Sequence, residues 1–198
     1  MAEVIPVIPQ PEPDSFDKRV RQPGVKWLAK NNLNRGHPLP SGVSPKPYWR
    51  ECLDDLYECY QGVCAYVCIH FERVTGGGTV DHFIPKSSLA GLTYEWSNYR
   101  LACQTMNSRK RDYIDVLDPF EVREGMFRLE LVSGRIFSNP GLSATDKEAV
   151  EETIRRLKLD SPACREIRAR HFFEYSSGDY TADFLKKRSP FVWSEARR

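Results

Sequence analysis

The sequence predicts an α+β fold in a chain of 198 residues. Three observations carry this prediction. A strand-like segment at 79–84 follows three consecutive glycines, apolar residues recur at helical spacing over 48–60, and a hairpin pattern at 126–137 precedes two helical segments. A chain of this length forms one elaborated domain or at most two small ones. We therefore expect an N-terminal arm over residues 1–47, a core over 48–118 and a C-terminal layer over 119–198.

The N-terminal stretch is rich in proline. Nine of the fourteen prolines precede residue 48, and the segments 5–6 and 8–13 have a polyproline-like pattern. This predicts an extended Pro-rich arm that packs across the domain or onto a partner. The alternative for its first dozen residues is disorder.

The predicted core begins with a helix and continues into two strands and a second helix. Trp49, Cys52, Leu56 and Cys59 recur on one face of a helix over 48–60, and Gln61-Gly62 ends it. The glycines 76–78 predict a turn, 79–84 a strand, 92–100 a looser strand or loop, and 102–112 a helix. This order would let His82 and Asn107 face each other across a cleft.

The C-terminal layer is predicted to contain a hairpin and helices packed on the core. Residues 126–132 alternate apolar and charged side chains, and Ser133-Gly134 turns the chain into 135–137. Thr145 and Glu148 have the spacing of a capping box at a helix start. Ser161-Pro162 predicts a second helix through about residue 173.

Composition limits the class of protein. No apolar run approaches the ~20 residues of a membrane span, and the N-terminus lacks the pattern of a secretory signal. We therefore expect a cytoplasmic protein without a membrane partner. Six cysteines in that setting are read as thiols or metal ligands rather than disulfides. The net charge of +2 does not by itself indicate a nucleic-acid-binding protein.

Four side chains in the predicted core suit phosphodiester hydrolysis. Asp81 and His82 are adjacent, Asn98 follows His82 by sixteen positions, and Asn107 follows Asn98 by nine. An imidazole can take a proton from water, and carboxylate and carboxamide oxygens can hold a hard divalent cation. Singly, each has a structural alternative, such as Asn98 in a turn or cap and Asn107 as a polar helix position.

In the segments 81–86 (DHFIPK), 96–103 (WSNYRLAC) and 107–110 (NSRK), the chain closely resembles the HNH endonucleases. The resemblance covers about Cys64 to Asp112 and implies a ββα-metal core. It implies that His82 is the general base, and that Asp81 and Asn107 bind one Mg²⁺ or Mn²⁺ ion. It also implies that Asn98 bonds backbone in the loop and so orients the base.

Basic residues surround this motif. Arg100, Arg109, Lys110 and Arg111 outnumber the single acid in 100–112, so we expect nucleic-acid contacts there, with DNA favoured over RNA. The alternative is a solvated helix face. Lys86 either contacts phosphate or caps the loop.

Many HNH relatives hold a structural zinc ion with two Cys-x-x-Cys pairs. Here Cys64 and Cys68 are one residue too far apart, and Met106 stands where the partner of Cys103 would lie. A thioether is a poor zinc ligand. We therefore expect no structural zinc and interpret Cys64, Cys68 and Cys103 as a vestigial site packed as small hydrophobes. The alternative is a zinc ion completed by His70 or Cys59.

The segments 95–98 (EWSN) and 81–86 (DHFIPK), together with the proline-led N-terminus, are also similar to HNH effectors of Septu-type and retron-associated anti-phage systems. Those effectors work with an ATPase. This resemblance implies a defence nuclease with an ATPase partner. Two alternatives remain open: a stand-alone restriction-type nuclease, and a non-catalytic interaction protein on a degenerate HNH scaffold.

Overall fold

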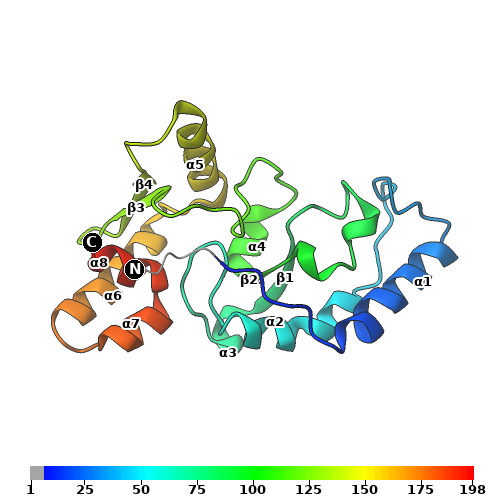
Figure 1. Cartoon of the computed structure of the whole chain (residues 1–198), viewed down its shortest axis with the longest axis horizontal. Coiled ribbons are helices and arrows are strands. Elements are labelled where there is room, and N and C mark those ends of the chain that lie inside the picture. The colour runs from blue at the N-terminus through cyan, green and yellow to red at the C-terminus, as the bar shows by residue number, and fades with distance from the viewer. Residues whose placement is uncertain (1–6) are drawn as a thin grey trace. The chain divides into compact units, whose positions relative to one another are not determined.

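The computed structural model describes residues 7–198 and shows a mixed α+β fold with two small antiparallel sheets (Figure 1). The described residues form two compact units. We call residues 9–62 and 72–114 the strand–helix unit, and residues 7–8, 63–71 and 115–198 the C-terminal unit. These units differ from the three predicted segments, because 63–71 groups with the end of the chain and 9–47 with the predicted core.

The strand–helix unit is built from short elements. In chain order they are η1 (Asp17–Arg21), α1 (Gln22–Lys30), η2 (Tyr48–Cys52), α2 (Leu53–Cys59), α3 (Arg73–Gly76), β1 (Gly78–His82), η3 (Ala90–Leu92), η4 (Trp96–Asn98), β2 (Tyr99–Cys103) and α4 (Gln104–Lys110). Its core includes Phe16, Leu56 and Leu101, each at most 1% exposed.

Two antiparallel strands followed directly by a helix form the centre of this unit. β1 pairs with β2 so that Asp81 lies opposite Arg100 and His82 opposite Tyr99. The predicted first strand is confirmed. The second strand begins only at Tyr99, because two short 3₁₀ turns occupy much of 90–98, and the helix begins at Gln104 rather than at 102.

The N-terminal stretch is not extended throughout, which corrects the prediction of an arm over 1–47. It is helical from Asp17 to Lys30. Pro23 has no N–H and directly follows the π-helical turn η1, so the continuous helix lacks one backbone hydrogen bond at this point. Gly24 meets the ring of Tyr94 so closely that a Cβ would lie 2.2 Å from it. Residues 9–13 remain without helix or strand, and the predicted piece at 5–6 lies outside the described residues.

The C-terminal unit contains the predicted hairpin and helices, with two additions. Its elements are β3 (Phe127–Glu130), β4 (Arg135–Ser138), α5 (Ala144–Leu157), α6 (Pro162–Ser176), α7 (Ala182–Arg188) and α8 (Pro190–Ala196). The cap of α5 is Ser143, whose Oγ accepts from the backbone N–H of Asp146 at 3.1 Å, so the predicted capping box at Thr145 is displaced. The short helices α7 and α8 were not predicted. Nowhere in residues 7–198 is there a helix with the length and apolar character to cross a bilayer.

Candidate active site

The predicted motif residues lie at the end of β1, in the loop that follows it, and on α4. Asp81 and His82 close β1, and both are buried, at 3% and 6% exposure. Residues 83–98 form the loop that leads to β2. The sequence therefore places an acid and an imidazole at a strand end, inside the strand–helix unit.

The ring of His82 is held by a hydrogen bond and two aromatic contacts. Nε2 lies 2.9 Å from the carbonyl oxygen of Thr93, and the rings of Trp49 and Tyr99 stand edge-on at 4.8 and 5.0 Å. A carbonyl oxygen only accepts, so Nε2 carries the proton and Nδ1 keeps the lone pair. Burial, together with the positive charge of Lys86, lowers the pKa of His82 to about 3. The imidazole is therefore neutral at pH 7, with Nδ1 as its basic atom.

Asn98 fastens the loop after β1. Its Oδ1 accepts from the backbone N–H of Ile84 at 2.8 Å, and its Nδ2 donates to the carbonyl oxygens of Ile84 at 3.0 Å and Leu92 at 3.1 Å. The side chain is 4% exposed. The expectation that Asn98 bonds backbone within this loop is confirmed.

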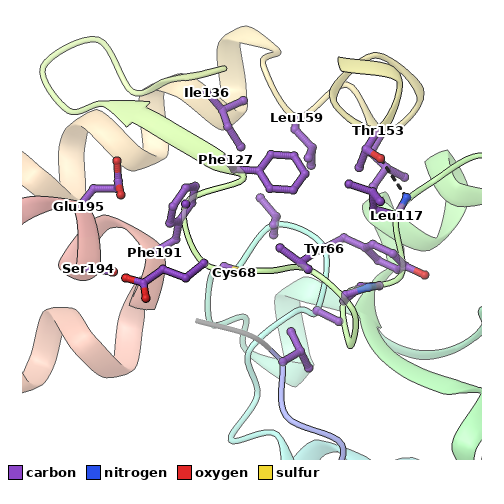
Figure 2. Close-up of a pocket in the computed structure, with 18 of the residues that line it drawn as sticks. Tyr66, Cys68, Leu117, Phe127, Ile136, Thr153, Leu159, Phe191, Ser194 and Glu195 are labelled. Carbon is purple, nitrogen blue, oxygen red and sulfur yellow. Dashed lines mark hydrogen bonds between the residues drawn. The ribbon is translucent and has the colours of Figure 1, made fainter. Parts of the chain in front are cut away.

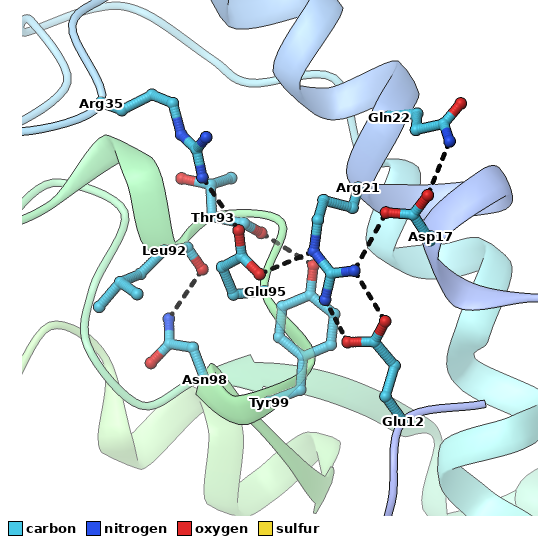
Figure 3. A network of polar contacts seen from close by, with 10 residues as sticks. All are labelled: Glu12, Asp17, Arg21, Gln22, Arg35, Leu92, Thr93, Glu95, Asn98 and Tyr99. Atoms are coloured by element: carbon cyan, nitrogen blue, oxygen red, sulfur yellow. Dashed lines mark hydrogen bonds and ion pairs between the residues drawn. The ribbon is translucent and has the colours of Figure 1, made fainter. Parts of the chain in front are cut away.

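A polar network ties the same loop to the N-terminal helices, and sequence reasoning missed it. Arg21 Nε donates to Glu95 at 2.8 Å, and Arg35 Nη2 donates to the other oxygen of Glu95 at 3.1 Å. Arg21 also pairs with Glu12 and Asp17 (Figure 3). We call these five residues the Glu95 network. No short-range pattern links an arginine to a glutamate 74 positions away.

Other bonds hold the residues around Glu95. The hydroxyl of Tyr99 donates to the Thr93 carbonyl at 2.8 Å, as Figure 3 shows, so this oxygen serves both Tyr99 and His82. The hydroxyl of Tyr94 donates to Lys46 O at 2.9 Å, and Trp96 Nε1 donates to Gln10 O at 2.8 Å. The loop that orients His82 is thus anchored at four consecutive residues, 93–96.

Asn107 reaches β1 from α4. Its Nδ2 donates to Thr79 Oγ1 at 3.0 Å, and that hydroxyl donates to Ala102 O at 2.8 Å. Side chains alternate along a strand, so Thr79 and Asp81 share one face of β1. Asn107 therefore lies on the Asp81 face, with its amide nitrogen engaged and its carbonyl oxygen as the atom suited to a metal. His82 occupies the alternate position on the strand and packs against Trp49 and Tyr99.

The donor set suits a hard cation that retains several waters. Asp81 offers a carboxylate and Asn107 a carboxamide oxygen, the ligand types preferred by Mg²⁺ and Mn²⁺. In residues 7–198, no cluster of three or more His, Cys, Asp or Glu side chains could hold a metal ion. Magnesium is commonly bound by one or two protein oxygens, with water and substrate phosphate completing its shell. Asp81 and Asn107 fit that mode.

Lys86 is a half-buried basic residue in the loop after β1, placed where it could contact a substrate. Its Nζ lies 4.6 Å above the ring of Trp49. Burial lowers its pKa, while the charges of Asp81 and Asp112 raise it. Lys86 also lines a surface groove with Ser87, Asp112 and residues 39–45. The charge of Lys86 thus acts on both Asp81 and His82, and its side chain lines an open groove.

Arg100 and Lys110 do not lie on the surface, which corrects their predicted role in nucleic-acid contact. They are 4% and 0% exposed. Arg100 Nη1 donates to Ser97 O at 2.8 Å and Tyr99 O at 3.0 Å, and Lys110 Nζ donates to Phe83 O at 3.1 Å. Both charges lie 5.2 Å from the centre of the Phe83 ring. They support the loop after β1 because their donors satisfy its backbone carbonyls. Of their basic neighbours, Arg109 is half-buried and Arg111 exposed.

The three cysteines of the predicted vestigial zinc site belong to different units. Cys64 and Cys68 lie in the C-terminal unit and Cys103 in the strand–helix unit. Burial raises the pKa of Cys68 to about 11, so its sulfur is a neutral thiol at pH 7. Of the alternative ligands, His70 Nδ1 accepts from Arg188 Nη1 at 2.9 Å. The absence of structural zinc stays a prediction.

Comparison with known proteins does not add a family assignment. No protein-family model matches the chain, and no curated protein gives a significant sequence match.

Proposed function

We propose that this protein is a metal-dependent endonuclease of the HNH type that hydrolyses phosphodiester bonds, with DNA as the favoured substrate. The observation that carries the proposal is the hydrogen bond between His82 Nε2 and the Thr93 carbonyl oxygen, 2.9 Å long. It fixes one tautomer and leaves the lone pair on Nδ1, so the ring can accept a proton at that atom.

In this proposal each motif residue has one task. His82 Nδ1 takes the proton from the attacking water, while Asn98 and the Glu95 network keep the Thr93 carbonyl in place. Asp81 and Asn107 hold one Mg²⁺ or Mn²⁺ ion through their oxygens. When bound, such an ion offsets negative charge that develops on the phosphate and the leaving oxygen. Lys86, beside the groove, contacts a substrate phosphate.

Two observations bear on the alternatives. The enclosed position of His82, only 6% exposed, favours a non-catalytic protein on an HNH scaffold, because a base must reach water. Against this alternative, Asn107 on α4 reaches the face of β1 that carries Asp81, which gathers two oxygen donors on one side of the strand. We further propose that the enzyme acts as the effector of an anti-phage system with an ATPase partner rather than as a stand-alone restriction-type nuclease.

The proposal is tested by incubating the purified protein with supercoiled plasmid in Mg²⁺, in Mn²⁺ and in EDTA. We expect nicked and linear products that require a divalent ion, with less cleavage of an RNA of equal length. Metal-independent products, or none under any of these conditions with or without a co-purified ATPase, would contradict it. Cleavage by the protein alone would favour the stand-alone nuclease over the ATPase-coupled effector.

A further inference from the structure

The C-terminal unit contains a half-open cavity of about 90 Å³, distant in sequence from the nuclease motif. It lies between the β3–β4 hairpin, α5, α8 and the segment 65–68, and its walls are mostly apolar (Figure 2). The main apolar lining residues are Tyr66, Leu117, Phe127, Ile136, Leu159 and Phe191. Figure 2 shows the rings of Phe127 and Phe191 among the side chains that line it.

One buried cation lines this cavity. Arg168, on α6, is 2% exposed. Its Nη1 donates to Leu159 O at 2.8 Å and to Gly134 O at 3.3 Å. Its Nε is enclosed and has no acceptor. Within residues 7–198, the hydrogen-bond acceptors of this guanidinium are thus neutral backbone carbonyl groups.

The acids near Arg168 are already matched by other arginines. Glu195, which also lines the cavity, pairs with Arg128 at 2.9 Å and with Arg198 at 3.0 Å. Asp160 pairs with Arg165, and its charge also acts on Arg168 without a hydrogen bond between them. In the part of the chain that the structure describes, Arg168 therefore brings a positive charge to an apolar wall with no carboxylate bonded to it. Burial of a charge is strongly unfavourable unless an opposite charge and hydrogen bonds compensate it.

We propose that this cavity binds a small organic anion, a carboxylate or phosphate carried on a short apolar stem, with Arg168 as the partner of the anionic group. An anion would supply both the missing charge and an acceptor for the unused donor, and arginine is well suited to both groups. A cavity of ~150 Å³ admits the six carbons of benzene, so this smaller one encloses roughly four heavy atoms, and the rest of the ligand extends through its open side. This site is independent of the proposed nuclease activity.

The first test compares matched ligands on the full-length protein at constant ionic strength. Butyrate and propyl phosphate carry the two anionic groups on a three-carbon stem, and butyramide is a neutral analogue of butyrate. We expect at least one anion to shift the backbone NMR signals of Phe127 and Leu159 saturably, with a Kd on the order of 1 mM, as befits so small a ligand. Butyramide should bind at least about tenfold more weakly. Which anion binds more tightly distinguishes a carboxylate from a phosphate ligand.

The second test changes the arginine. Arg168→Gln should abolish saturable binding, while Arg170→Gln, the same change at an exposed position of the same helix, should leave it intact. Equal binding of butyrate and butyramide, saturable binding retained in Arg168→Gln, or no saturable shift with either anion would overturn the proposal. If Arg168→Gln does not fold, the comparison of butyrate with butyramide on the native protein decides the matter alone.

Discussion

The Nε2 atom of His82 and the carbonyl oxygen of Thr93 lie 2.9 Å apart, eleven residues apart in the chain. This contact determines which imidazole nitrogen is basic, because a carbonyl can only accept a hydrogen bond. The orientation of the proposed base therefore depends on the loop that presents Thr93, and the loop depends on Asn98 and the Glu95 network.

Replacing Asn98 should damage both stability and activity. Asn98→Ala leaves the N–H of Ile84 and the carbonyl groups of Ile84 and Leu92 without their side-chain partner inside the protein. Unsatisfied buried polar groups cost about 1–3 kcal/mol each, so the free energy of unfolding should fall by roughly 2 kcal/mol or more. Urea unfolding followed by circular dichroism measures this loss. An Asn98→Ala protein as stable as the native one would show that the loop is held by other contacts alone.

Asp81→Ala and Asn107→Ala should instead raise the metal requirement. If these residues bind the ion through oxygen, each variant loses cleavage in Mg²⁺ and regains part of it in excess Mn²⁺, because a weakened site is refilled by mass action. Cleavage rates across a metal titration give the concentration for half-maximal activity. An unchanged half-maximal concentration in both variants would exclude them as ligands.

The Glu95 network should contribute measurably to stability. Glu95→Gln removes a charge that two arginines share, with the side chain only 21% exposed. Exposed ion pairs contribute about 0–1 kcal/mol, and hydrogen bonds to charged groups up to about 3 kcal/mol, so we expect a loss near 1 kcal/mol. Asp54→Asn is the matched control, because Asp54 pairs with Arg73 but is 73% exposed. Chemical denaturation of both variants should show a loss for Glu95→Gln alone, and equal losses would refute a special role for the network.

Acid should destabilise the C-terminal unit through His171. Burial, aided by Arg188, lowers the pKa of His171 in the folded protein to about 4, whereas an unfolded histidine has a pKa near ~6.5. Between these two pKa values the unfolded state binds more protons than the folded state. The contribution of the neutral His171 to the free energy of unfolding is therefore full above pH ~6.5 and is lost as the pH falls toward 4. We expect the free energy of unfolding, measured by urea denaturation, to fall between pH 7 and pH 5 by less in His171→Asn than in the native protein. The exposed His37→Asn should keep the native difference, and identical losses in all three proteins would rule out His171 as the cause.

The sequence was most informative where the structure depends on short-range patterns. The strand before Phe83, the helix after Trp49 and the hairpin at Gly134 follow from alternation, helical spacing and a turn that needs positive φ, here 68°. The backbone-bonding role of Asn98 followed from its place in the motif. These features depend on residues close together in the chain.

Long-range packing decided what the sequence could not show. Proline content suggested an extended arm, yet the burial of Phe16, Val20 and Leu28 stabilises helices there. Arg100 and Lys110 looked like surface cations, yet both donate to carbonyls inside the unit. The acceptor of Lys110 lies 27 residues away, whereas Arg100 is turned inward to carbonyls of its own segment, Ser97 and Tyr99.

The central claim, that His82 is the general base, is tested most directly by single-turnover cleavage of plasmid DNA by His82→Ala. The matched control is His37→Ala, which removes an exposed histidine of the same unit. Loss of a general base typically costs ~10²–10⁴ in rate. We predict a loss of this size for His82→Ala, with DNA binding unchanged by gel shift and with native cleavage retained in His37→Ala. Cleavage by a folded His82→Ala protein within a few-fold of the native rate would contradict the account.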